Sequence, residues 1–273
     1  IFLENLGNPA FNIPDYEPIV EMARRKGICV MVDNTFGMGG YLFRPFEWGA
    51  NVSIHSATKW ICGHGTALGG VVVDGGNFDW TPEKYPLLAA PSESYHGLVY
   101  KEVFGDAAFA GRVRVDGLRN IGPSASPFNS FLMLQGLETL SLRAERCCSN
   151  ALAIAEFLEG HPAVESVNYV GLKSNPYYDL ACKYLRNGFG GVLTFRVKGG
   201  FEAAAALVSR LDLILHVGSV GDAKSLIVHP ASTTHSQLSP EEQVAAGVYP
   251  NMLRLSVGIE NVDDLIADLS AAL

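Results

Sequence analysis

Residues 28–36, ICVMVDNTF, decide the fold, because an uninterrupted apolar run, Ile28–Val32, ends abruptly in polar side chains. Such a run is typical of a strand that is buried on both faces of a parallel sheet. The segment Asp15–Arg25 before it has apolar residues at helical spacing and ends in basic residues ahead of a glycine, which predicts a helix. Helices that alternate with buried strands indicate an α/β fold with a mostly parallel sheet. Two further short strands are predicted at Val52–His55 and Gly70–Val73.

The remaining chain predicts a second, differently built region. Residues 74–126 are rich in Gly, Pro and aromatic side chains, which predicts a loop-dominated region with short helical pieces over the sheet. Residues 128–158 carry apolar side chains at helical spacing, so one long helix, or two joined end to end, is expected. We therefore expect a large domain over residues 1–145 and a C-terminal α+β domain over residues 146–273. Its expected strands are Gly191–Val197, Ile214–Val217, Leu226–His229 and Leu253–Val257, with helices at 201–210 and 261–272.

Composition excludes several classes of protein. The chain has 273 residues, of which 48% are hydrophobic and 18% charged, so it can bury a sizeable core. Its net charge of -8 argues against a nucleic-acid binder, and no apolar run approaches the ~20 residues that span a bilayer. Five cysteines without paired spacing favour a reducing compartment, and we expect a cytoplasmic protein. The apolar opening, IFLEN, resembles an interior strand, so an N-terminal portion is expected to be missing.

The candidate chemistry lies at the ends of the first strands. In open α/β sheets, ligands bind at the carboxyl ends of strands, where Asp33 is expected. Lys59 follows 26 positions later, beside the hydroxyl residues Ser56 and Thr58. A carboxylate can pair with a pyridinium nitrogen, an amine can form an imine with an aldehyde, and hydroxyls can bind a phosphate. These are the three needs of pyridoxal 5'-phosphate.

Each of these residues also has an ordinary structural interpretation. Asp33 could cap a turn, and the hydroxyls of Ser56 and Thr58 could satisfy local backbone groups. Other patterns fail: the glycines at 37–40 lack the third glycine of a dinucleotide loop, and the seven histidines show no HExxH spacing. No metal site is predicted.

Several motifs occur together in one order. They are ENLGNPAFNIPD at 4–15, VDNTF at 32–36, HSATKWICGHGTALGGVVVDGG at 55–76, YHG at 95–97, GPSASPFNSFLMLQGLETLSLRAER at 122–146 and LRLSVGIE at 253–260. In these motifs the chain resembles the Cys/Met-metabolism pyridoxal-phosphate enzymes of the aspartate-aminotransferase fold, fold type I, and among them the O-acetylhomoserine sulfhydrylases. The resemblance covers essentially the whole chain. It implies that residues 1–145 form the cofactor-binding large domain, and that further cofactor contacts of the family lie upstream of residue 1.

The resemblance also implies a role for each site residue. Lys59 matches the lysine that forms the imine with the cofactor, and Asp33 matches the partner of the pyridine nitrogen. Ser56 and Thr58 match phosphate ligands. Asn8 matches a contact to the cofactor hydroxyl or to the substrate. The substrate carboxylate matches Ser219 and Arg254, and in the strand pattern of LRLSVGIE the arginine lies on the face opposite Leu253 and Leu255.

The implied activity is a γ-replacement on O-acetyl-L-homoserine, in which sulfide or methanethiol displaces acetate to give homocysteine or methionine. The implied assembly is a homotetramer built from two active dimers. Two alternatives stay open. One is another enzyme of the same family, a cystathionine or methionine γ-lyase or a cystathionine γ-synthase. The other is a catalytically incomplete segment that serves as a structural partner.

Overall fold

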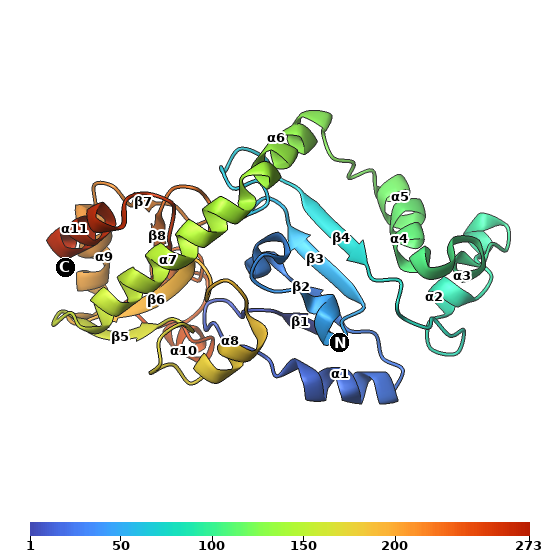
Figure 1. Ribbon diagram of the computed structural model, residues 1–273, viewed down its shortest axis with the longest axis horizontal. Coiled ribbons are helices and arrows are strands. Elements are labelled where there is room, and N and C mark those ends of the chain that lie inside the picture. Colours follow the sequence, from blue (N-terminus) through green and yellow to red (C-terminus); the bar gives the residue numbers. More distant parts are fainter.

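The computed structural model describes residues 1–273 and contains two separate sheets joined by a long helical rod (Figure 1). The first sheet has the order β1-β2-β3-β4. Its first three strands run parallel and β4 is antiparallel to β3, as expected for a mostly parallel sheet. The predicted helix is α1 (Tyr16–Arg25). The strands are β1 (Phe2–Glu4), β2 (Met31–Asp33), β3 (Val52–Ser56) and β4 (Gly70–Asp74).

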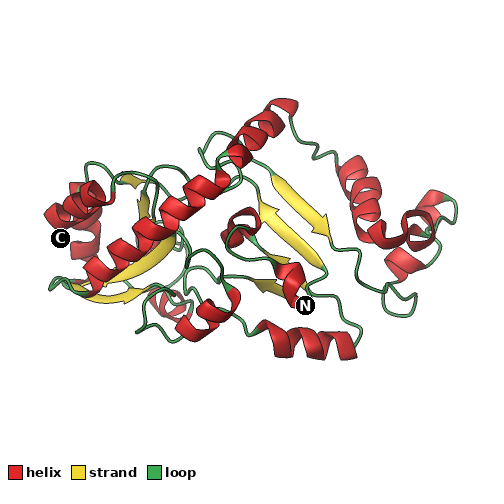
Figure 2. Ribbon diagram, viewed as in Figure 1, coloured by secondary structure: helices red, strands yellow, loops and turns green.

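Residues 74–126 contain the short helical pieces that were expected, but they are more helical than a loop-dominated region. Figure 2 shows a group of helices there, and short helices follow one another from residue 100 to residue 121, with a break in helical geometry at Gly105. They form because Trp80, Leu88 and Tyr100 pack in a small core on Val52 of β3 and on Cys29, which precedes β2. The elements are α2 (Pro86–Ala89), η3 (Glu93–Tyr95), α3 (Tyr100–Phe104), η4 (Gly105–Ala107), α4 (Ala108–Arg112), η5 (Val113–Leu118) and α5 (Arg119–Ile121).

The long apolar stretch after residue 126 forms two helices joined end to end, one of the two outcomes expected. They are α6 (Pro127–Glu138) and α7 (Leu140–Glu159), and Thr139 between them leaves helical geometry. Together they cross the molecule from the first sheet to the second (Figure 1).

The second sheet has the order β5-β6-β9-β8-β7 and is antiparallel except for the pair β7–β8. One face packs on α7, α9 and α11 in a core of 21 buried residues. These elements agree with the expected α+β region. The strands are β5 (Val164–Asn168), β6 (Val192–Val197), β7 (Leu215–His216), β8 (Leu226–Val228) and β9 (Met252–Ser256). The helices are α8 (Tyr178–Tyr184), α9 (Gly200–Arg210), α10 (Pro240–Ala245) and α11 (Val262–Ala272), with shorter turns η1 (Thr35–Gly40), η2 (Pro45–Trp48) and η6 (Pro230–Ser232).

A further hydrophobic core joins the part of the chain around the first sheet to the part around the second sheet. A cluster of 20 buried residues combines Val30 and Val32 of the first half with Ala144 and Cys148 of α7 and Tyr184 of α8. The chain segments that carry the candidate site are therefore fixed against one another by packing. No helix of the chain is both long enough and apolar enough to cross a membrane.

Gly136 in α6 lies directly against the turn that carries Lys59. A β-carbon at this position would lie 2.3 Å from the carbonyl oxygens of Ile61 and Cys62. We expect Gly136→Ala to lower the free energy of unfolding by about 1–3 kcal/mol, the usual cost of overpacking. Thermal or denaturant unfolding measures this. Gly117→Ala is the matched control, because a β-carbon there meets nothing within 4 Å, and it should be neutral or slightly stabilising. Equal stability of the two variants would contradict the contact.

Candidate active site

The candidate site begins where β2 and β3 end, at the same edge of the first sheet. Asp33 pairs with Ile54 in the parallel register, so Ser56 and the turn after it follow close by. One carboxylate oxygen of Asp33 accepts the backbone N–H of Thr35 at 2.9 Å. The hydroxyl of Thr35 accepts the backbone N–H of Ser56 at 2.8 Å. Thr35 thus ties the ends of the two strands together and leaves the second oxygen of Asp33 without a protein partner. Sequence reasoning missed Thr35, although it stands within the VDNTF motif.

Lys59 lies in a tight turn, residues 57–63, directly after β3. Its Nζ donates to the hydroxyl of Ser219 at 2.9 Å, across 160 positions of sequence. Burial lowers the pKa of the Lys59 amine, and the positive charge of Arg254 lowers this pKa further. A lowered pKa leaves more of the amine unprotonated near neutral pH, which is the form that acts as a nucleophile or base.

Arg254 is on β9 and only 7% exposed. Its neighbours Leu253 and Leu255 are fully buried in the core of the second sheet, whereas its guanidinium donates to the side-chain oxygen of Asn8 at 3.2 Å. The predicted alternation of faces in this strand is thereby confirmed. Burial lowers the pKa of Arg254, and the group forms no ion pair in the chain, so it is available to an incoming anion.

The two hydroxyl residues before Lys59 differ in what they contact. The hydroxyl of Thr58 donates to the carbonyl of Gly69 at 3.3 Å and accepts the N–H of the same residue at 3.1 Å. The hydroxyl of Ser56 makes no hydrogen bond within the chain. Thr58 therefore links the turn to the start of β4, and Ser56 carries the freer of the two hydroxyls.

These side chains fit the chemical needs of pyridoxal 5'-phosphate. A carboxylate with one unused oxygen, an amine of lowered pKa and a free hydroxyl all stand at or just after the carboxyl ends of two neighbouring parallel strands. Two residues from the second half of the chain lie near the amine of Lys59. Ser219 accepts a hydrogen bond from it, and the cationic Arg254 acts on it electrostatically. The structure thus brings Lys59 together with Ser219 and Arg254, and Arg254 together with Asn8.

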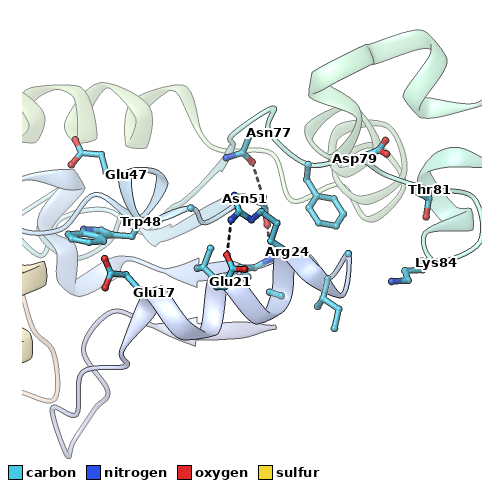
Figure 3. A pocket seen from close by; sticks show the side chains of 17 residues that line it. Glu17, Glu21, Arg24, Glu47, Trp48, Asn51, Asn77, Asp79, Thr81 and Lys84 are labelled. Carbon is cyan, nitrogen blue, oxygen red and sulfur yellow. Dashed lines mark hydrogen bonds and ion pairs between the residues drawn. The ribbon is translucent and has the colours of Figure 1, made fainter.

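A sizeable surface pocket lies elsewhere. It has a volume of about 860 Å³ and lies between α1 and residues 77–84 (Figure 3). Its polar lining is largely satisfied internally: Arg24 pairs with Glu21 at 2.7 Å, and Asn51 donates to Asn77 at 3.0 Å. None of the predicted site residues lines it.

Comparison with known proteins identifies the family of the chain. The family Cys/Met metabolism PLP-dependent enzyme matches residues 1–273. O-acetyl-L-homoserine sulfhydrylase 1 of Thermus thermophilus is 55% identical over 272 residues, which are 100% of this chain and 65% of that protein. Homocysteine synthase of Schizosaccharomyces pombe is 51% identical over 275 residues, 100% of this chain and 64% of that protein. The chain thus spans just under two thirds of the length of these relatives.

A solved structure agrees closely with the fold. It is named for an O-acetylhomoserine (thiol)-lyase of Campylobacter jejuni and is described with N'-pyridoxyl-lysine-5'-monophosphate. Its TM-score is 0.94 at 42% identity, and the match covers 100% of this chain and 65% of that one. The family, the fold type and the cofactor expected from the sequence are confirmed by these matches.

Proposed function

Because the chain belongs to the Cys/Met metabolism PLP-dependent enzyme family, we propose that it carries out a γ-replacement on O-acetyl-L-homoserine. In this reaction the bond from Cγ to the acetate oxygen breaks and a bond from Cγ to the sulfur of sulfide or methanethiol forms. The products are acetate and homocysteine or methionine. The observation that carries the proposal is the contact of Lys59 with Ser219 beside buried Arg254. The names of the relatives supply the substrate class.

Five residues would hold the cofactor. Lys59 would carry it covalently, Asp33 would accept a hydrogen bond from its ring nitrogen, and Ser56 and Thr58 would bind its phosphate. Asn8 would contact the cofactor hydroxyl or the substrate. When bound, the cofactor withdraws electrons from the amino acid attached to it, which acidifies the protons on Cα and then on Cβ.

Lys59 would also move protons. Once the substrate amine takes its place, the free amine of Lys59 would act as a base, and its lowered pKa favours the unprotonated form. Ser219, which contacts this amine in the resting chain, would hold it in place until the substrate arrives.

Arg254 and Ser219 would bind the α-carboxylate that every candidate substrate carries, with Asn8 beside Arg254. A planar guanidinium can donate two parallel hydrogen bonds to a carboxylate, which an ammonium cannot reproduce. We expect Arg254→Lys to lower kcat/KM for O-acetylhomoserine by roughly 10- to 150-fold, equivalent to about 1.5–3 kcal/mol for hydrogen bonds to a charged group. The absorbance of the bound cofactor should remain. Steady-state kinetics with an exposed-arginine control, Arg186→Lys, measures this effect. A wild-type kcat/KM, or loss of bound cofactor, would contradict the assigned role.

Product analysis tests the function. Incubation with O-acetylhomoserine and sulfide should yield homocysteine and acetate in equal amounts. Release of 2-oxobutyrate without sulfur incorporation would instead identify a γ-lyase, and cystathionine from added cysteine would identify a γ-synthase. Absence of cofactor absorbance with added pyridoxal 5'-phosphate would identify the catalytically incomplete segment.

Three further features of the protein are part of the proposal. The separate sheets support a boundary between residues 145 and 146, although Val170 and Tyr184 pack on the core that includes the first sheet. Five free cysteines support a reducing compartment, the cytoplasm.

Exposed apolar side chains on α6 support a homo-oligomer, with a tetramer of two dimers as the expected form. They are Phe128, Phe131, Leu134 and Leu137. Sedimentation that finds a fully active monomer would contradict this assembly.

A further inference from the structure

Arg143 on α7 is a buried cation that the proposed chemistry does not use. Its side chain is 5% exposed and forms no ion pair in the chain. All three of its partners are neutral: Nε donates to the hydroxyl of Thr139 at 3.2 Å, Nη1 to the carbonyl of Trp60 at 3.0 Å and Nη2 to the carbonyl of Gly136 at 2.6 Å. Asp222 is near enough to attract this charge but forms no ion pair with it. A buried charge without a direct ion pair is costly, so Arg143 is expected to do more than fill space.

The partners of Arg143 point to that reason. Trp60 follows Lys59 directly, and its carbonyl belongs to the turn at residues 57–63. The turn also passes so close to the guanidinium that a β-carbon on Gly63 would lie 1.9 Å from Nη1. The other two partners, Thr139 and Gly136, lie at the junction of α6 and α7. Arg143 therefore links the turn at residues 57–63, which carries Lys59, to α6 and α7 by hydrogen bonds.

The loop that carries Ser219 is anchored on the same turn. The N–H of Ala223 donates to the carbonyl of Gly63 at 2.8 Å. A β-carbon on Gly221 would lie 2.8 Å from the backbone nitrogen of Trp60, so this loop also packs on the turn. A displacement of the turn would thus disturb both partners of the Lys59–Ser219 hydrogen bond.

We propose that Arg143 is a positioning residue for Lys59: it holds the turn at residues 57–63 against α6 and α7, and so keeps the amine in reach of the cofactor aldehyde. The inference rests on the proposed function, in which Lys59 carries the cofactor. The planar guanidinium matters because its three separate nitrogens reach one hydroxyl and two carbonyls. An ammonium donates from a single nitrogen, and a thioether donates no hydrogen bond.

The test measures covalent attachment of the cofactor rather than turnover. Cofactor-free protein is titrated with pyridoxal 5'-phosphate, reduced with borohydride, and mapped by peptide mass to quantify attachment at Lys59. Arg143→Met should weaken attachment at Lys59 by about tenfold or more, the scale of a lost hydrogen bond from a charged group. Arg143→Lys should be intermediate. Arg146→Met is the matched control, because Arg146 is exposed on the same helix, and it should match the wild type.

The possible outcomes distinguish the positioning role of Arg143 from the proposed role of Lys59 as the residue that carries the cofactor. Wild-type protein that attaches no cofactor at Lys59 overturns both. If the wild type attaches it and Arg143→Met does so equally well, with only a lower melting temperature, Arg143 merely stabilises the fold and the inference is overturned. If Arg143→Met fails to fold, Arg143→Lys decides: weakened attachment in a folded variant supports the positioning role, and wild-type attachment overturns it.

Discussion

Replacement of Lys59 by alanine is expected to abolish covalent attachment of pyridoxal 5'-phosphate and to lower kcat by at least about 10²–10⁴-fold, the usual contribution of a positioned proton-transfer group. The amine contacts Ser219 at 2.9 Å, and its pKa is lowered by burial and by Arg254. No other lysine is part of the candidate site. Non-covalent binding of the cofactor should persist, because the contacts assigned to Asp33 and Ser56 remain.

The measurement combines absorbance of the added cofactor with homocysteine formation. Lys173→Ala is the control, since Lys173 is exposed, and it should retain both signals. A small primary amine added to the Lys59→Ala protein should restore part of the turnover if the missing function is proton transfer. Wild-type turnover in the Lys59 variant would show that another group carries the cofactor.

The strands were predictable because short apolar runs rich in β-branched residues are typical of strands, even where, as in β4, the strand is exposed in the chain. The predicted segments at Val52 and Gly70 match β3 and β4 within one residue. The run Ile28–Val32 was less accurate, since β2 begins only at Met31, where Phe2 becomes its partner. Burial sets how far a hydrophobic run extends, whereas a partner strand sets how far the hydrogen-bonded ladder extends, so the two limits need not coincide.

The extent of the helices after β4 was not predictable from local signals. Gly105, Gly111 and Gly117 are weak helix formers, and they suggested loops. In the structure Gly111 is required by close packing, because a β-carbon there would lie 2.6 Å from the ring of Phe104. The tertiary contact overrides the low helix propensity of the glycine, and only the folded chain reveals it.

The site residues also fall into those that the sequence pattern predicts and those that it does not. The proximity of Asp33, Ser56 and Lys59 follows from neighbouring parallel strands, so spacing and strand ends were sufficient to expect it. The contact of Lys59 with Ser219 joins residues 160 positions apart, and no periodicity predicts it. Only the family resemblance placed Ser219 at the site. Arg143 had no signal at all, because an arginine in a helical pattern is ordinarily a surface residue.

Asp33→Asn is expected to leave the cofactor attached but to lower kcat by roughly 10²–10³-fold, the usual cost of removing one preorganised electrostatic group. One oxygen of Asp33 accepts the N–H of Thr35 at 2.9 Å, and the amide oxygen of asparagine can keep this bond. The amide nitrogen then takes the place of the second carboxylate oxygen. It is a donor, so it cannot accept a hydrogen bond from a protonated ring nitrogen, and it carries no charge to stabilise that proton.

The neutral ring withdraws electrons less strongly, so abstraction of the Cα proton should slow while substrate capture through Arg254 is retained. The expected signature is a large fall in kcat with little change in KM, together with an altered absorbance of the bound cofactor. Asp79→Asn is the control, because Asp79 is 78% exposed and lies on the surface, where its ion pair with Lys101 contributes little. Cofactor loss in the Asp33 variant would mean that Asp33 acts mainly in binding. An unchanged kcat would show that the ring nitrogen needs no carboxylate partner here.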